Sequence, residues 1–226
     1  MIKDNTEKNL CLGREEMQEI ASKRVSGIAE EFRAGFEFLA HYPMSVTFFG
    51  SSKFDPENPY YKSAETLASR IVREVGCPIV SGGGPGIMEA ANKGAHEAGG
   101  DSLGLLIELP EGGQRTNEYI TKSIPFHYFF VRKVCLAFSA ETFIFFPGGF
   151  GTMDELFELL TLIQTKKVEG VPLVCVGKDY WEIWKKEMEK EMLDRGAIDK
   201  EDLDIMHITD NHDEVIDIIK RAKTNC

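Results

Sequence analysis

Two glycine-rich segments carry the strongest chemical signal in the sequence. Residues 81–86 read SGGGPG and residues 147–152 read PGGFGT, and each lies between an apolar run and a helical pattern. Glycines there let backbone N–H groups approach a ligand closely, and the N-terminus of the following helix adds partial positive charge. Together the segments predict an anion-binding site with phosphate as its ligand. The alternative is that the glycines only permit tight turns.

Neither segment matches the well-known nucleotide-binding templates. Gly82, Gly84 and Ile87 fail the G-x-G-x-x-G pattern at its last position, and the sequence contains no G-x-x-x-x-G-K-[ST]. Ordinary NAD binding and P-loop hydrolysis therefore lack their fingerprints. Glu108 follows the first segment at about the spacing of a ribose-binding acid. A solvated loop carboxylate is at least as good an interpretation of Glu108.

Three charged residues near the second segment could act on a bound ligand. Glu155 falls in the first turn of the helix that follows this segment, so we expect it to face the ligand edge of the sheet. A charge that only stabilises the helix end is the alternative. Arg132 and Lys133 interrupt the apolar run FFVRKVCLAF. They could grip a phosphate, whereas a structural salt bridge is the competing interpretation.

Alternating apolar runs and helical patterns must hold these residues in place. Strands such as VTFFG and TFIFF are apolar at successive positions, as in a parallel sheet that helices cover on both faces. We expect strands at 45–49, 78–80, 102–107, 142–146 and 172–176, and a short one near Ile208. We expect helices at 14–40, 60–75, 87–98, 129–140, 152–164, 180–195 and 213–223.

This alternation predicts a doubly wound, Rossmann-like α/β fold with three layers. We expect an N-terminal extension over residues 1–43, formed by the first, amphipathic helix, and a single nucleotide-binding domain over residues 44–226. Residues 108–128 show no periodicity and include Gly112, Gly113 and Pro125. They are expected to form an irregular loop that borders the site.

Composition argues against several classes of protein. A net charge of −11 and a pI near 5.0 disfavour a broad surface for nucleic acid or anionic lipid. The five cysteines include no C-x-x-C pair and have no histidine nearby at metal-ligand spacing, which indicates a reduced, cytoplasmic chain without a structural metal. The N-terminus is polar, and no segment approaches the roughly 18 apolar residues of a membrane span.

The segments GGGPGIMEA and PGGFGTMDE, with Arg132 and Lys133 ahead of the second, resemble the Lonely Guy (LOG) family of cytokinin-activating enzymes. Many of its members are labelled lysine decarboxylases. The resemblance covers about residues 44–195. It implies hydrolysis of the N-glycosidic bond of an adenosine 5′-monophosphate, usually N6-modified, to free base and ribose 5-phosphate. No cofactor and no metal is implied.

The resemblance also assigns residues to roles. It makes Arg132 and Glu155 the catalytic pair. It places the substrate phosphate and the rest of the nucleotide on Ser51, Ser81, Gly82, Gly83, Met88, Lys133, Gly148, Gly149, Gly151 and Thr152.

The residue types suit this chemistry. Cleavage of a ribosyl bond passes through an oxocarbenium-like state, which a carboxylate beside the ribose could stabilise while orienting its hydroxyls or activating water. A phosphate held at a helix N-terminus would orient the sugar against Glu155, and Arg132 could polarise the base or grip the phosphate. A decarboxylase would need a lysine in a pyridoxal phosphate setting, which the sequence does not supply.

Some features depart from the compact members of the family. They read GGG-x-x-G-L-M-G where this chain has Ile87-Met88-Glu89, and the N-terminal extension is additional, so the chain resembles a longer branch. Family members are dimers or larger, which implies a homo-oligomer. The amphipathic helix could contribute a contact or pack on its own domain. A carrier resembling the molybdenum cofactor carrier proteins is the alternative function, although it would not need Glu155 with Arg132.

Overall fold

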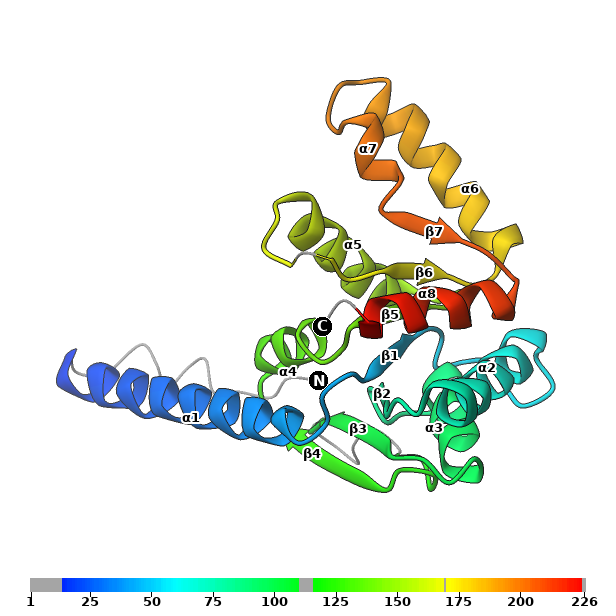
Figure 1. The fold of residues 1–226 in the computed structure, drawn as a ribbon. Coiled ribbons are helices and arrows are strands. Elements are labelled where there is room, and N and C mark those ends of the chain that lie inside the picture. The colour runs from blue at the N-terminus through cyan, green and yellow to red at the C-terminus, as the bar shows by residue number, and fades with distance from the viewer. Residues whose placement is uncertain (1–13, 110–115, 169, 225–226) are drawn as a thin grey trace.

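Seven parallel strands form one sheet in the computed structural model, which describes residues 14–109, 116–168 and 170–224 (Figure 1). Their order across the sheet is β4-β3-β2-β1-β5-β6-β7. The strands are β1 (Val46–Phe49), β2 (Ile79–Ser81), β3 (Ser102–Ile107), β4 (Lys122–Phe126), β5 (Thr142–Phe145), β6 (Leu173–Cys175) and β7 (Met206–Ile208).

Helices cover both faces of this sheet, so the fold has the three layers that the sequence predicted. Helices α2, α3 and α8 share one apolar cluster with the sheet, and α1, α4, α5, α6 and α7 share the other. The helices are α1 (Arg14–Ala40), α2 (Pro59–Val75), α3 (Ile87–Glu97), α4 (Phe129–Ala137), α5 (Phe150–Gln164), α6 (Lys178–Met188), α7 (Lys200–Leu203) and α8 (His212–Thr224).

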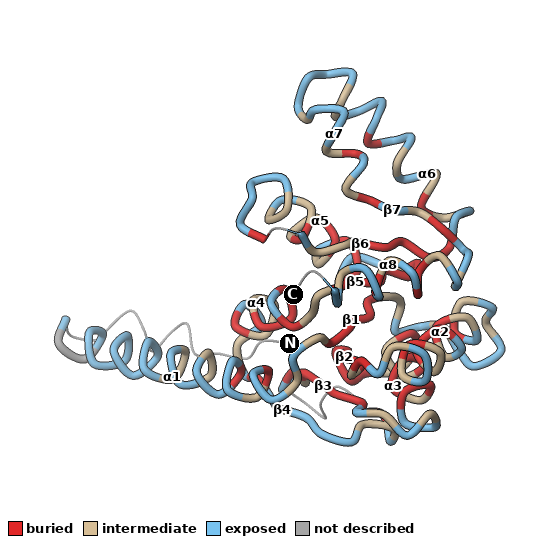
Figure 2. The backbone as a smooth tube through the Cα atoms, in the orientation of Figure 1, coloured by how far each residue is buried: buried red, intermediate tan, exposed pale blue. Residues whose placement is uncertain are grey.

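Successive side chains of the central strands explain why both faces are covered. Phe48 packs into the cluster of α2, α3 and α8, whereas Phe49 packs into the cluster on the opposite face. Ile144 and Phe145 divide between the same two clusters. A strand whose residues alternate between two apolar layers must be apolar throughout, which is the pattern seen in the sequence. Figure 2 shows this buried sheet at the centre of the molecule.

Two of the secondary-structure predictions were wrong. The predicted irregular stretch 108–128 contains the strand β4, although residues 110–115 lie outside the described residues. β4 is an edge strand that pairs with β3, and Lys122, Ser123 and Pro125 are exposed. An edge strand needs no continuous apolar run and tolerates proline, so its sequence resembles a loop. The predicted helix 180–195 ends earlier, since α6 passes at Met188 into a π-helical turn.

The strand order creates a switch point between β1 and β5. The chain moves outward from β1 to β4 and then returns to place β5 on the free side of β1. The loops after β1 and β5 therefore leave the sheet side by side and turn to opposite faces. In open α/β sheets, ligands bind in the crevice at such a point.

Helix α1 is fastened to the domain by its C-terminal half. Leu39 is buried, and the Glu31 carboxylate accepts hydrogen bonds of 3.1 Å from the backbone N–H groups of His127 and Tyr128. The N-terminal half projects away from the sheet, and the described side chains over 17–26 are exposed (Figures 1 and 2). The predicted helix is confirmed, whereas the domain boundary at residue 43 stays a prediction.

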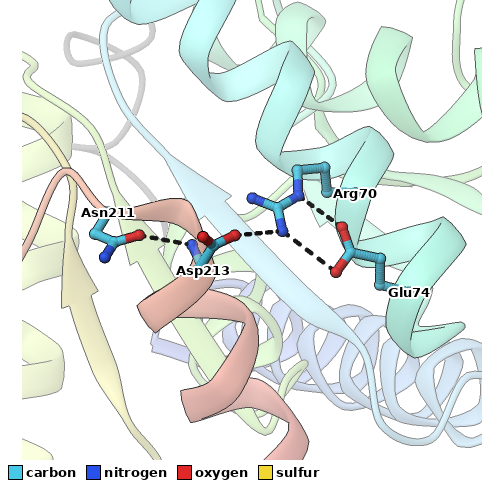
Figure 3. A network of polar contacts seen from close by, with 4 residues as sticks. All are labelled: Arg70, Glu74, Asn211 and Asp213. Atoms are coloured by element: carbon cyan, nitrogen blue, oxygen red, sulfur yellow. Dashed lines mark hydrogen bonds and ion pairs between the residues drawn. The ribbon is translucent and has the colours of Figure 1, made fainter.

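A polar network fastens the C-terminal helix α8 to α2 (Figure 3). Arg70 of α2 lies 2.6 Å from the Glu74 carboxylate, by its Nε, and 2.7 Å from the Asp213 carboxylate, by its Nη2. Asn211 accepts a 3.0 Å hydrogen bond from the Asp213 backbone N–H through its Oδ1. The network lies on the face of the sheet opposite to α4 and α5.

The cysteines of the described residues are buried and unpaired. Cys77, Cys135 and Cys175 are free thiols, whereas Cys11 and Cys226 lie outside the described residues. Across the part of the chain that the structure describes, no helix combines the length and hydropathy that would let it cross a bilayer.

Candidate active site

A cavity of about 600 Å³ opens at the carboxyl ends of the strands, at the switch point between β1 and β5. The loop after β1, both glycine-rich turns and the inner face of α4 contribute to its wall. Eight of the predicted site residues line it: Ser51, Gly82, Met88, Arg132, Gly149, Gly151, Thr152 and Glu155. The fold thus collects residues from four separate parts of the chain around one space.

Arg132 enters the cavity from α4 and is held by backbone carbonyls. Its Nε donates a 2.7 Å hydrogen bond to the Leu105 carbonyl, and its Nη2 donates a 3.3 Å hydrogen bond to the Gly82 carbonyl. Among the residues that the structure describes, Arg132 takes part in no ion pair. Burial lowers the pKa of this guanidinium, although an arginine remains charged. The cavity therefore holds a fixed positive charge without a carboxylate bonded to it.

Glu155 faces the same cavity from the first turns of α5. Burial raises the pKa of its carboxyl to about 7, and Glu158 adds to the rise while Lys133 and Arg132 oppose it. A carboxyl whose pKa lies near neutral pH can hold or release a proton under working conditions. The position and pKa of Glu155 are thus compatible with acid–base chemistry.

The first glycine-rich turn is set in a buried polar network. The Ser81 hydroxyl accepts a 2.9 Å hydrogen bond from the Gly83 N–H and donates one of 2.6 Å to Asn92 Oδ1. Asn117 donates 3.0 Å hydrogen bonds from its Nδ2 to Asn92 Oδ1 and to the Gly84 carbonyl. Ser81 and Gly83, two of the predicted ligand residues, lie outside the cavity lining and shape the turn that borders it.

The second glycine-rich turn is open where the ligand would lie. A Cβ atom added to Gly149 or Gly151 would meet no other heavy atom within 4 Å. Gly148 differs, since its Cβ would lie 2.0 Å from Thr152 Oγ1, and its carbonyl accepts a 2.8 Å hydrogen bond from the Tyr180 hydroxyl. The turn is therefore tightly packed at Gly148, and its rim, formed by Gly149 and Gly151, is open.

Two other charged residues from the sequence analysis lie away from the cavity. Lys133 was predicted to contact the nucleotide but lies outside the cavity lining. Its Nζ lies 2.8 Å from Asp154 Oδ2 and 3.5 Å from Glu158 Oε2, so it forms the structural salt bridge that was the competing interpretation. Glu108 is exposed, lies 3.9 Å from His127 Nδ1 and is not part of the lining. This position agrees with a loop carboxylate rather than a ribose ligand.

Sequence reasoning missed several residues of this site. Asn92 and Asn117 were not singled out, although Asn92 lies on the apolar face of α3, where a polar residue is a usable signal. Lys53 and Phe129 also line the cavity and were not predicted. Phe129 shares a helix with Arg132, but nothing in its local pattern separates it from a core phenylalanine.

A family profile matches the part of the chain that begins at Met88. The profile of a protein family described as "Possible lysine decarboxylase" matches residues 88–219, which is more than half of the chain. The chain belongs to this family. The matched region contains Arg132, the PGGFGT segment and Glu155, whereas the cavity residues Ser51, Lys53 and Gly82 precede it.

Curated relatives come from plants. The cytokinin riboside 5′-monophosphate phosphoribohydrolase LOG2 of Arabidopsis thaliana is 31% identical over 128 residues, which are 57% of this chain and 60% of the relative. The corresponding LOG5 protein is 30% identical over 53% of this chain and 52% of the relative. The chain thus spans little more than half the length of these relatives. Their names confirm the resemblance to the Lonely Guy family.

Solved structures share the fold. The molybdenum cofactor carrier protein of Chlamydomonas reinhardtii superposes with a TM-score of 0.59 at 22% identity, covering 80% of this chain and 98% of that one. The molybdenum cofactor binding protein of Rippkaea orientalis gives 0.57 at 20% identity, covering 79% and 94%. These similarities establish the Rossmann-like architecture.

Proposed function

We propose that this chain hydrolyses the N-glycosidic bond of an adenosine 5′-monophosphate, with or without an N6 substituent. The observation that carries the proposal is the position of Arg132 and Glu155 in one cavity with the open rim of the PGGFGT turn. The names of the plant relatives point to the same reaction class.

The reaction breaks the bond between ribose C1′ and the base nitrogen. The bonding electron pair leaves with the base, water adds its oxygen to C1′, and one water proton ends on the base. The products are free base and ribose 5-phosphate. Glu155, in its carboxylate form, stabilises the positive charge that develops on the ribose and accepts a proton from the attacking water. This proton then passes to the departing base, which restores the carboxylate. Arg132 holds the base or the phosphate from the opposite wall.

The second glycine-rich turn supplies the anchor. Gly149, Gly151 and Thr152 line the cavity at the N-terminus of α5, where free N–H groups and the helix dipole favour an anion. A phosphate bound there would orient the sugar toward Glu155, one helical turn further along. Binding energy from the phosphate would in this way be used to position the reacting bond.

The test is release of free base from AMP and from isopentenyladenosine monophosphate by the purified protein. We expect Glu155→Gln and Arg132→Ala each to lower kcat by at least about a hundredfold, the scale for a positioned acid–base group or charge stabiliser. Asp154→Asn is the matched control, since Asp154 lies next to Glu155 but outside the cavity lining. It should retain most of the activity.

The pH profile gives a second readout. Because the carboxylate is the active form, kcat/KM should rise as the pH passes the Glu155 pKa of about 7. Glu155→Gln should lack this dependence. A wild type that releases no base from either nucleotide but still binds phosphorylated ligands would support the carrier function instead.

We also propose that the chain forms a homo-oligomer through an aromatic surface on α1 and α4. The surface consists of Phe36, Phe129, Phe130 and Phe138, which are 43–56% exposed. Phe32 links three of these rings, since its centroid lies 6.4 Å from those of Phe36 and Phe130, and Phe36 lies 6.3 Å from Phe138. Exposed apolar side chains that gather in this way mark protein–protein contacts. Phe129 also lines the cavity, so this surface borders the proposed site. Phe130→Asp should yield monomers in analytical ultracentrifugation, and an unchanged mass would exclude this interface.

A further inference from the structure

Among the described residues, three charged ones line the cavity: Lys53, Arg132 and Glu155. Lys133 adds little net charge because Asp154 and Glu158 both lie within ion-pair distance of it. A nucleoside monophosphate brings a charge of about −1.5 to −2 at neutral pH. With Glu155 ionised, Arg132 alone would leave the occupied cavity strongly negative. Within residues 14–109, 116–168 and 170–224, Lys53 is the second cationic residue at the cavity wall.

The backbone places Lys53 between the two glycine-rich turns. Ser51 donates a 3.0 Å hydrogen bond from its N–H to the Pro147 carbonyl, at the start of the second turn. The Ser51 carbonyl accepts a 3.0 Å hydrogen bond from the Ile87 N–H, just after the first turn. The Lys53 N–H in turn bonds to the Ser51 hydroxyl at 3.1 Å. This loop is therefore fixed against both turns, and Lys53 lines the same cavity as the N-terminus of α5.

The Lys53 ammonium is not committed to a protein partner. Within residues 14–109, 116–168 and 170–224, Lys53 takes part in no ion pair, and the residue is exposed. Arg132, by contrast, already donates to two carbonyls. A lysine ammonium on its flexible stem binds phosphate as a mobile point charge, and loses little when no ion pair must first be broken.

From these observations we infer that Lys53 binds the 5′-phosphate of the substrate and selects nucleotides over nucleosides. The inference rests on the proposed hydrolase function and adds a specificity-determining residue to it. The glycine-rich turn supplies neutral N–H donors, and Lys53 supplies the charge. Loss of Lys53 should thus weaken binding of ligands that carry the phosphate and leave binding of those without it unchanged.

The experiment compares wild type with Lys53→Gln and Lys53→Arg. We expect Lys53→Gln to raise the KM for AMP, and the inhibition constant of ribose 5-phosphate, by about tenfold to a hundredfold, the scale of one charge-assisted hydrogen bond. The kcat for AMP and the inhibition constant of adenosine should stay within about threefold of wild type. Lys53→Arg should recover most of the affinity. Lys62→Gln, which removes a nearby exposed lysine paired with Glu57, is the matched control.

The outcomes separate this inference from the proposed function. If wild type cleaves AMP and Lys53→Gln changes adenosine and AMP binding equally, or neither, the phosphate role is wrong while the hydrolase function stands. If wild type does not cleave AMP, the proposed function fails, and calorimetric binding of AMP and adenosine to the same variants decides the role of Lys53. A selective loss of AMP binding supports the inference in either case.

Discussion

The two glycine-rich turns look alike in the sequence but differ in the structure. In the turn of residues 82–86, a Cβ on Gly82 would lie 2.3 Å from Arg132 Nη2, and a Cβ on Gly86 would lie 2.2 Å from the Ser51 carbonyl oxygen. In the other turn, Gly149 and Gly151 face open space. At Gly82 and Gly86 the protein fills the space that a side chain would need, whereas at Gly149 and Gly151 that space is open. The same residue type is therefore required by packing at the first pair of positions, and at the second pair it leaves room for the proposed ligand.

The largest effect is expected for Gly86→Ala. Gly86 has φ 73° and ψ −132°, a conformation that side chains oppose, and its Cβ would overlap the backbone of Ser51 and Ser52. We expect the free energy of unfolding to fall by at least about 3 kcal/mol, measured by urea denaturation. Gly76→Ala is the control, since Gly76 has a similar φ of 74° but no atom within 4 Å of the added Cβ. If both variants lose the same stability, packing does not distinguish the first turn.

Asn92→Ala tests the network behind the first turn. Asn92 is fully buried, and its side chain bonds to Ser81, Ser102 and Asn117. Its removal leaves buried partners unsatisfied and should lower the free energy of unfolding by about 2 to 3 kcal/mol. In a double-mutant cycle, Asn117→Ala should cost less in the Asn92→Ala background than in wild type. Strictly additive losses would show that the two asparagines act independently.

Glu155→Gln is expected to stabilise the protein at alkaline pH. The pKa of about 7 in the folded state lies above the ordinary glutamate value of 4.5, so the native state binds the proton more tightly than the unfolded state. The resulting cost is absent below pH 4.5, grows as the pH rises and is complete above 7. After allowance for solvent screening, the variant should gain about 1 to 2 kcal/mol at pH 8 and almost nothing at pH 4.5. A pH-independent difference would contradict the buried-carboxylate explanation.

The smallest change in stability is expected for Gly151→Ala, in the open turn. Gly151 is exposed near the start of α5, where alanine is the better helix former. Thermal unfolding should show a gain of up to about 1 kcal/mol. The KM for AMP should rise nevertheless, because the added methyl group lines the cavity. A clear loss of stability with unchanged KM would reverse the distinction between the two turns.

Much of the fold follows from local patterns, and so does part of the candidate site. The order of strands and helices and the approach of Glu155 to the cavity follow from apolar runs and from the rule that ligands meet the carboxyl ends of strands. β4 escaped notice because one edge strand with Pro125 carries too little apolar signal. β4 is recognised by its pairing with β3, and the sequence pattern predicted the strand β3 but not that pairing.

The missed site residues depend on tertiary contacts. Lys53 is an ordinary surface lysine until the Ser51 hydrogen bonds place its loop between the two turns. Asn117 acquires its role only when the segment after residue 115 folds over the first turn, where its N–H bonds to the Gly83 carbonyl at 3.0 Å. The position of Lys133 beside two acids on α5 likewise depends on how α4 and α5 pack.

The switch point between β1 and β5 also affects the order in which the cavity can be assembled. Val46 pairs with Thr142, so the central junction of the sheet joins segments that are far apart in the chain. Contacts of high sequence separation form slowly because a long loop must be closed first. The units from β1 to β4 can pair while the cavity still lacks the PGGFGT turn and Glu155. During refolding, recovery of ligand binding should therefore lag behind the recovery of secondary structure. Ligand binding would then report when β5 pairs with β1.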